Sequence, residues 1–303
     1  MTLRITKASD PITVAQIVTT IYGFPGSWKT SLAFTTHAPL LLDFDGGAHR
    51  AKYRKDTVQV AAWTDVTAIT PASIAKYKTI IVDTAGRALD VLAADIQSPE
   101  RDPKGKMGRG GALSLQGFGK LKGEFISWLK ALRALGLDVV LMLHVDEQRS
   151  GDDILERIDA QGGSKNEIYK VSDAMGRIAL RDGKRMLLFS PTDTAFGKNP
   201  GELTPLEIPT FGPESSWLGD VIDQIKVHLN RQSDEQTVWM QALIAWAERV
   251  KVCTTAAALT GLIAEAGTLE PTVVDNAKRV LASFAKQHGF TFDKKTGGFV
   301  EGK

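Results

Sequence analysis

The segment Ile21–Ala33, IYGFPGSWKTSLA, has the spacing of a phosphate-binding loop with one departure from the pattern. The motif places a glycine, four variable residues and then Gly-Lys-Ser/Thr between a strand and a helix. Gly23, Lys29 and Thr30 fall in register, but Trp28 occupies the position of the second glycine. Tryptophan keeps the backbone N–H that contacts phosphate. The loop therefore remains able to bind if Trp28 has ordinary helical torsions and its ring points away from the ligand.

This loop predicts a site for ATP and Mg²⁺. Backbone N–H groups at the start of the helix would surround the phosphates, Lys29 would reach the β- and γ-phosphates, and the Thr30 hydroxyl would hold Mg²⁺. The alternative is a turn that only shares the spacing, but the strand before and the helix after favour phosphate binding. The residues predicted to bind the nucleotide are Gly23, Phe24, Pro25, Gly26, Ser27, Trp28, Lys29, Thr30 and Ser31.

Strand-like and helix-like segments alternate around this loop, from about residue 17 to about residue 145. Apolar runs such as VVLML (139–143) lack polar alternation, which is typical of parallel strands covered by helices on both faces. The alternation predicts an α/β fold with a mainly parallel central sheet. Apolar spacing predicts a helix over 114–135, and the pair Asp182-Gly183 predicts a hairpin between two strands.

A segment rich in proline and glycine, residues 196–215, predicts a domain boundary near residue 213. We therefore expect a core over 1–212, followed by a small, purely helical C-terminal region over 213–303. Its apolar positions recur at helical spacing and are most simply core contacts of a small bundle. The helices expected in this region are 216–229, 235–250, 255–266 and 271–288.

Polar side chains stand at the ends of three predicted strands. Asp83 ends TIIVD, the pattern of a Walker B carboxylate that holds Mg²⁺. Asp43 and Asp45 follow the next strand after the phosphate loop, where a carboxylate can orient or deprotonate the water that attacks the γ-phosphate; a solvated strand end is an equal alternative. His144 ends VVLMLH and either senses the γ-phosphate or is a structural residue. The predicted catalytic residues are Lys29, Asp45, Asp83 and His144, and the predicted metal ligands are Thr30 and Asp83.

Composition excludes several classes of protein. The 303 residues carry a net charge of +2 and are 43% hydrophobic, which is ordinary for a soluble globular chain. Cys253 is the only cysteine, so an internal disulfide and a cysteine-based metal site are ruled out, and the histidines lack zinc-ligand spacing. The apolar runs are too short for a membrane span and the N-terminus lacks a signal-peptide core, so we expect a cytoplasmic protein.

Six segments, taken in order, resemble the RecA-type ATPase core, and more closely the RecA-like P-loop ATPases of phages that act as single-strand annealing proteins in recombination. They are IYGFPGSWKTSLA, PLLLDFDGG, KTIIVDTAGRALDVL, DVVLMLHVDEQ, GGSKNEIYKVSDAMGRI and LLFSPTDTAFGKNPG. The resemblance covers about residues 17–212. RecA-type proteins carry Asp-x-Glu after the phosphate-loop helix, with the glutamate as catalytic base. Asp43 and Asp45 match these positions, and Asp45 is shorter than glutamate. His144 matches the γ-phosphate sensor, and some phage recombinases also seat an aromatic residue where Trp28 stands.

The resemblance further implies single-stranded DNA as a partner, bound by two mobile loops. The first is RDPKGKMGRGG (101–111), a flexible cationic loop suited to phosphates, for which a solvated surface loop is the alternative. The second would lie within residues 146–166, which are more acidic. The residues predicted to contact DNA are Lys104, Lys106, Arg109 and Lys120.

RecA-type ATPases also bind nucleotide between neighbouring subunits of a ring or filament, and a cation from the neighbour completes the site. Lys198 or Arg185 would supply that cation by analogy, and a solvated surface residue is the alternative. The implied partners are further copies of the chain and a single-strand-binding protein, in the cytoplasm of a bacterial host and without a membrane.

Three functions fit these observations. The first, which we favour, is an ATP-dependent, single-stranded-DNA-binding recombination or annealing protein whose hydrolysis is stimulated by DNA. The second is a nucleotide-binding annealing module with little hydrolysis, which Trp28 and the short Asp45 favour. The third is an NTPase for another replication task, such as helicase loading.

Overall fold

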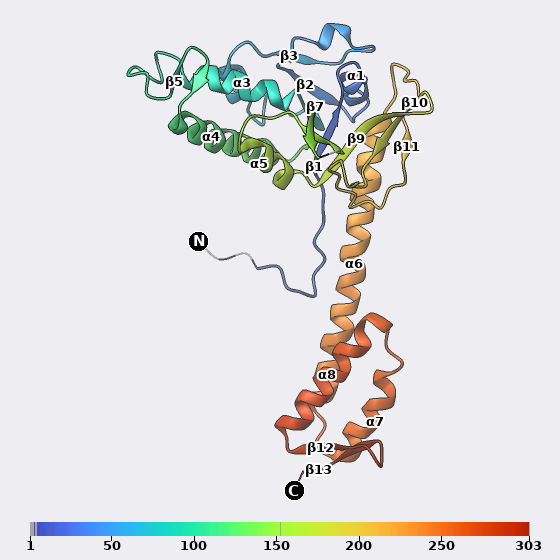
Figure 1. The fold of residues 1–303 in the computed structure, drawn as a ribbon. Coiled ribbons are helices and arrows are strands. Elements are labelled where there is room, and N and C mark those ends of the chain that lie inside the picture. The colour runs from blue at the N-terminus through green and yellow to red at the C-terminus, as the bar shows by residue number, and fades with distance from the viewer. Residues whose placement is uncertain (1–2, 4, 152, 303) are drawn as a thin grey trace. The chain divides into compact units, whose positions relative to one another are not determined.

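A computed structural model describes residues 3, 5–151 and 153–302. The chain divides into two compact units (Figure 1): Val14–Leu229, and a second unit made of Met1–Thr13 with Asn230–Lys303. Helix α6, Trp217–Lys251, contributes residues to both. Among the described residues, no helix combines the length and apolar content needed to cross a bilayer.

The first unit is built on a sheet that is mainly parallel, as the sequence predicts. Six neighbouring strands run parallel to one another, and β10, β11 and β8 are antiparallel additions. The strand order is β11 (Leu206–Glu207), β10 (Lys184–Leu188), β9 (Ala174–Arg181), β1 (Val18–Gly23), β7 (Asp138–Ser150), β4 (Thr79–Asp83), β2 (Pro39–Asp43) and β3 (Thr57–Gln59), with β8 (Asp153–Ile158) paired to β7. Strand β1, which leads into the phosphate loop, is buried throughout its length.

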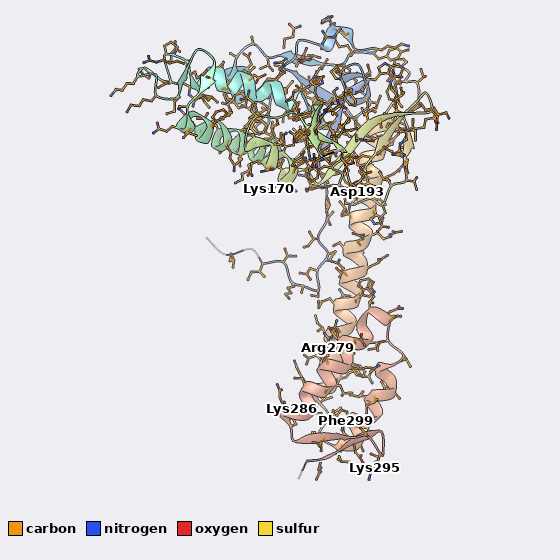
Figure 2. All side chains as sticks on the ribbon, viewed as in Figure 1. Lys170, Asp193, Arg279, Lys286, Lys295 and Phe299 are labelled. Carbon is orange, nitrogen blue, oxygen red and sulfur yellow. The ribbon has the colours of Figure 1, made fainter. Side chains whose placement is uncertain are left out.

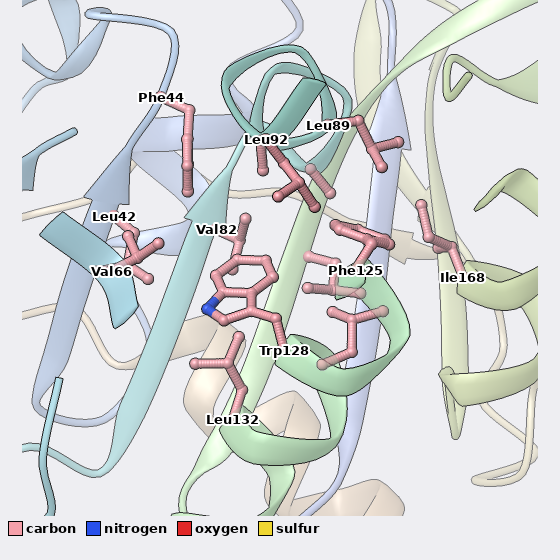
Figure 3. Packing of buried hydrophobic residues seen from close by; sticks show 14 of the residues in the cluster. Leu42, Phe44, Val66, Val82, Leu89, Leu92, Phe125, Trp128, Leu132 and Ile168 are labelled. Atoms are coloured by element: carbon pink, nitrogen blue, oxygen red, sulfur yellow. The ribbon is translucent and has the colours of Figure 1, made fainter. Parts of the chain in front are cut away.

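Helices cover both faces of the sheet with separate apolar cores. One core joins the sheet to α2 (Trp63–Thr67), α3 (Ala85–Ile96), α4 (Leu115–Ala134) and α5 (Ser164–Val171). The other joins it to α1 (Lys29–Ala33) and the first turns of α6. Figure 3 shows the indole of Trp128, from α4, lying beside Val82 of β4 within the first core. The sheet is therefore covered by helices on both faces.

Helix α4 confirms the helix predicted over residues 114–135, with one correction. Ser114 caps it by accepting a hydrogen bond from the Gly117 N–H at 3.1 Å. Leu121, Phe125 and Trp128 are buried as expected, but Leu115 and Phe118 are 92% and 42% exposed. The apolar side chains of the first turn are therefore not part of the buried face of α4.

The hairpin predicted at Asp182-Gly183 is confirmed. Strands β9 and β10 pair antiparallel around this dipeptide. Both residues have positive φ, 51° and 75°, as a two-residue turn of this type requires.

The C-terminal region differs from the purely helical prediction. The expected helices 216–229 and 235–250 form the single helix α6, because the polar link NRQSD contains no glycine or proline to break it. Helices α7 (Ala256–Ala266) and α8 (Pro271–Gln287) agree with expectation, but strands β12 (Phe290–Asp293) and β13 (Gly298–Glu301) form an unexpected hairpin.

The first unit also extends past the predicted boundary at residue 212, to Leu229, since Leu218, Ile222 and Ile225 belong to its core. The remaining short elements are the 3₁₀ turn Ala48–Arg50, β5 (Gly108–Arg109) and β6 (Ala112–Leu113).

Candidate nucleotide-binding site

The sheet brings the predicted site residues to one edge. Parallel strands end together at their carboxyl ends, where α/β proteins bind ligands. Gly23 at the end of β1 lies opposite His144 on β7, and Asp43 at the end of β2 lies opposite Asp83 on β4. The phosphate loop spans residues 23–29, between β1 and α1.

Trp28 does not have the expected helical torsions. Its φ of 72° and ψ of 21° are left-handed, which is the conformation a glycine would supply at this position. For a residue with a side chain this costs about 1–2 kcal/mol. The guanidinium of Arg185, on β10, lies 3.7 Å from the centre of the indole ring and offsets part of that cost. Trp28 thus reproduces the glycine backbone, with its ring stacked on Arg185.

Lys29 is buried at the start of α1 and folded back onto its own loop. Its ammonium donates to the carbonyl oxygens of Gly23 at 3.0 Å and Phe24 at 2.9 Å. Burial lowers the pKa of Lys29 to about 8, although the charges of Asp83 and Asp45 oppose this shift. Because two carbonyls of the loop hold this buried cation, Lys29 can exchange these bonds for phosphate oxygens.

Thr30 and Asp83, the two predicted metal ligands, are in direct contact. The Thr30 hydroxyl donates to Asp83 Oδ2 at 2.5 Å, so the Walker B carboxylate meets the phosphate-loop hydroxyl. Burial raises the pKa of Asp83, and the Thr30 hydrogen bond and the Lys29 charge counter that effect. This hydroxyl–carboxylate pair is a set of hard oxygen ligands suited to Mg²⁺.

The loop also contains a buried polar atom that a phosphate would satisfy. Ser27 Oγ has no hydrogen-bond partner among the described residues. A Cβ at Gly23 would lie 2.9 Å from this oxygen and 3.1 Å from Ile178 Cβ, so only glycine fits there. The residues present therefore fit ATP with Mg²⁺: Lys29 and Ser27 toward phosphate, Thr30 and Asp83 toward the metal.

Asp43 and Asp45 have different roles although they are two residues apart. Asp43 is 3% exposed and accepts hydrogen bonds from the N–H groups of Gly47 at 3.1 Å and Ala48 at 3.0 Å, so it fixes the chain after β2. The Asp45 carboxylate is 28% exposed and lies 3.5 Å from Arg87 and 3.7 Å from Arg50. Of the two, Asp45 is the carboxylate that remains available to a water molecule.

His144 lines a small cavity together with the start of α3 and residues 159–161. The cavity measures about 110 Å³, and its lining includes Thr84, Arg87 and Asp159. Within the described part of the chain, His144 Nδ1 is buried and has no partner. Burial and the nearby Lys29 charge lower the pKa of His144, which favours a neutral imidazole. The strand does not end at His144 as expected, because β7 continues to Ser150 in its pairing with β8.

A family profile described as an AAA domain matches residues 15–200, which is more than half of the chain. The chain belongs to the AAA domain family. The AAA domain protein is also similar to the solved structure of a KaiC-like protein from the hyperthermophilic archaeon Pyrococcus horikoshii OT3. That match has 12% sequence identity and a TM-score of 0.38, and it covers 66% of this chain and 87% of the other. No curated protein matches the sequence.

Membership of this family supports the prediction that the chain is a P-loop NTPase. The AAA domain protein has the α/β core and phosphate loop of a P-loop NTPase, and the profile spans the loop, Asp83 and His144. It ends before α6, so it says nothing of the second unit.

The AAA domain protein has a larger cavity beside α1 that the sequence analysis missed. It measures about 250 Å³ and is lined on one side by Trp28 and Ser31 and on another by the segment Arg50–Lys55. Within this segment Tyr53 is 37% exposed, and Lys52 lies 5.0 Å above its ring. The run HRAKYRK (49–55), basic with one aromatic residue, is the signal that could have revealed this surface.

The two cations predicted to act on a neighbouring subunit are engaged within their own chain. Lys198 donates to the carbonyl oxygens of Tyr169 at 2.5 Å and Ser172 at 2.7 Å. Arg185 stacks on Trp28. Arg185 thus lies at the loop of its own subunit, and the structure does not bring Lys198 there.

In the predicted DNA loop of the AAA domain protein, one carboxylate holds two backbone N–H groups. Asp102 accepts hydrogen bonds from the N–H groups of Lys106 at 2.8 Å and Met107 at 2.7 Å. Lys104, Lys106 and Arg109 are exposed around the β5–β6 hairpin, and the half-buried Lys120 is on α4. Across the described residues, none of these four cations is in an ion pair. The second predicted loop, 146–166, is largely the β7–β8 hairpin.

Proposed function

We propose that this AAA domain protein is an ATPase, dependent on Mg²⁺, that binds single-stranded DNA and acts in recombination or annealing. The contact between Thr30 and Asp83, beside the buried ammonium of Lys29, carries the ATPase part of the proposal. The exposed loop cations Lys104, Lys106 and Arg109, which form no ion pair with another described residue, support the DNA part.

In the proposed reaction each residue has a defined task. Lys29 exchanges the carbonyls of Gly23 and Phe24 for phosphate oxygens and stabilises the charge that develops during transfer. Thr30 and Asp83 would hold Mg²⁺, which would neutralise charge on the phosphates. Asp45 orients the attacking water, and neutral His144 can donate or accept a hydrogen bond near the γ-phosphate.

The 250 Å³ cavity beside α1 is the proposed place for the nucleoside. Ser31 follows the loop directly and lines this cavity, so a chain of phosphates bound at the loop leads into it. Tyr53 and Trp28 offer aromatic surfaces to a base, and Arg50 and Lys52 offer positive charge to the phosphates. Further copies of the chain in a ring or filament, and a single-strand-binding protein, are the proposed protein partners.

Phosphate release with and without single-stranded DNA tests this function. We expect DNA to stimulate hydrolysis in the wild-type protein and to have little effect in the variant Lys104→Ala/Lys106→Ala/Arg109→Ala, with basal hydrolysis unchanged. A matched control, Lys170→Ala/Lys184→Ala/Lys251→Ala, removes three exposed lysines that are held in ion pairs. Hydrolysis that is indifferent to DNA in the wild-type protein would overturn the DNA part.

A second function is supported by two observations at the same site. Trp28 has a strained backbone, and Asp45 is shared between Arg50 and Arg87, so the loop could bind ATP and hydrolyse it slowly. ATP binding without measurable phosphate release would select this nucleotide-ordered annealing module instead.

A further inference from the structure

The second unit contains two helices joined by a short turn and followed by a hairpin. Helix α7 ends at Ala266, the link 267–270 begins with Gly267, and α8 starts at Pro271. Strands β12 and β13 then pair antiparallel around a turn at 294–297. This order of elements is that of a helix-turn-helix with a hairpin after its second helix.

A small core holds these elements together. Trp246, near the end of α6, donates its indole N–H to the Ala277 carbonyl of α8 at 3.1 Å. The hairpin packs on α7, where the Phe299 N–H donates to the Thr260 hydroxyl at 2.8 Å. A Cβ at Gly298 would lie 2.7 Å from the Thr260 side chain, so the backbone of β13 packs closely against α7. Each helix thus has one face fixed by the unit itself.

The opposite face of α8 is polar and exposed. Val273, Ala277, Leu281 and Ala285 recur every four residues and are buried. Because an α-helix has 3.6 residues per turn, Arg279 and Lys286 lie on the side away from them. The other exposed polar residues of that side are Thr272, Asp275, Asn276 and Ser283. Figure 2 shows Arg279 and Lys286 on this helix and Lys295 on the hairpin.

The cations of α8 and of the hairpin turn are not in ion pairs within the described part of the chain. Lys278, Arg279 and Lys286 of α8, and Lys294 and Lys295 at the hairpin turn, make no ion pair with any other described residue. By contrast, Arg249 and Lys251 on α6 pair with Glu265 and Glu248. The carboxylate of Asp293 accepts hydrogen bonds from the Lys295 N–H at 2.8 Å and the Thr296 hydroxyl at 3.1 Å, so it orders the turn. Asp275 is the only acid on the exposed side of α8.

We propose that the second unit binds double-stranded DNA, with α8 in the major groove and the turn of the β12–β13 hairpin on the adjacent phosphates. The major groove of B-DNA admits an α-helix, whereas that of duplex RNA is too narrow. Arg279, Lys286, Lys294 and Lys295 contact phosphates, and Thr272, Asn276 and Ser283 have the hydrogen-bonding groups that meet base edges. This duplex site is separate from the proposed single-strand loop and does not depend on ATP hydrolysis.

Fluorescence anisotropy of a labelled duplex, titrated with the full-length protein without nucleotide, tests the proposal. We expect Arg279→Ala/Lys286→Ala to weaken binding at least about tenfold and to reduce the slope of log affinity against log salt by about 2, since each lost phosphate contact removes about 0.9. Lys294→Ala/Lys295→Ala should act in the same direction. The matched control from the same unit is Arg249→Ala/Lys251→Ala, which removes two paired cations and should leave both quantities unchanged.

Two further arms separate this site from the single-strand loop. In the Lys104→Ala/Lys106→Ala/Arg109→Ala protein, duplex binding should persist, and adding Arg279→Ala/Lys286→Ala should still weaken it at least about tenfold. The proposal is overturned if the α8 variant binds the duplex as the control does, or if it loses affinity only for single strands or for duplex RNA.

Discussion

Two strand ends at the same edge of the sheet carry polar groups of opposite kinds. In the loop after β1, polar groups are available to a ligand. Among the described residues, Ser27 Oγ has no partner, and Lys29 donates only to two backbone carbonyls. At the end of β2 the protein satisfies its own polar groups, since Asp43 caps two backbone N–H groups. A polar residue at a strand end is therefore a binding group only where the fold leaves it without a permanent partner.

The largest expected effect is at Lys29, in the loop after β1. Lys29→Ala removes the buried cation of the loop, and we expect ATP hydrolysis to fall about 100- to 1000-fold. Phosphate release measures it. Lys170→Ala, an exposed lysine paired with Glu167, is the control and should hydrolyse ATP at the wild-type rate. Hydrolysis above a tenth of the wild-type rate in Lys29→Ala would place the phosphates elsewhere.

Asp43 and Asp45 provide the sharpest contrast between the two roles. Asp45→Asn should lower hydrolysis roughly 100-fold without changing the free energy of unfolding, because it removes a group that orients water. Asp43→Asn should instead lower the free energy of unfolding by about 1–3 kcal/mol, because one amide nitrogen cannot accept the buried N–H that the carboxylate held. Denaturant unfolding measures the free energy of unfolding of both variants, and phosphate release measures their rates of hydrolysis. The reverse pattern would contradict the assignment of roles.

The pH dependence of ATP affinity tests whether Lys29 is as buried as the structure shows. Its pKa of about 8 means that the cation needed for phosphate is lost as the pH rises through 8. Affinity should be constant below that pH and then fall about tenfold per pH unit. The unfolded chain keeps this proton up to a pKa near 10.5, so Lys29 adds to the free energy of unfolding as the pH rises between 8 and 10.5.

A control is available at the same position. In Lys29→Arg the guanidinium stays charged, so any remaining affinity should show no break near pH 8. Wild-type affinity that stays flat up to pH 9.5 would mean that Lys29 is more solvated than its 6% exposure implies.

The smallest expected effect concerns the backbone of Trp28. Trp28→Gly should be about 1 kcal/mol more stable than Trp28→Ala, because only glycine tolerates the left-handed torsions without strain. A double-mutant cycle with Arg185→Ala should give a coupling of about 0.5–1 kcal/mol for the stacked pair. Equal stability of the glycine and alanine variants would argue against a left-handed residue at this position.

Local patterns predicted the parts of this site that local chemistry determines. The spacing of Gly23, Lys29 and Thr30, and Asp83 at the end of an apolar strand, were enough to predict the loop and the parallel sheet, because both depend on neighbouring residues. The prediction of helical torsions at Trp28 was wrong, because the loop imposes at this position the left-handed backbone that glycine supplies in the motif. The separate roles of Asp43 and Asp45 were missed for a similar reason, since they depend on how the chain turns after β2.

The C-terminal errors have an equally physical origin. A polar stretch such as NRQSD interrupts the apolar period without breaking a helix, so α6 was divided in two. The alternation in FTFD and GFVE was outweighed by the helices before it, and the β12–β13 hairpin was missed. Both features decide what the second unit presents to a partner.

Titration calorimetry of ATP with Mg²⁺ tests most directly whether the loop around Lys29 binds a triphosphate with Trp28 in its left-handed conformation. We predict saturable binding of a single ATP per chain in the wild-type protein and in Trp28→Gly, and no measurable binding in Lys29→Ala. Absence of binding in the wild-type protein, or equal binding in Lys29→Ala, would contradict the assignment of this loop as the nucleotide site.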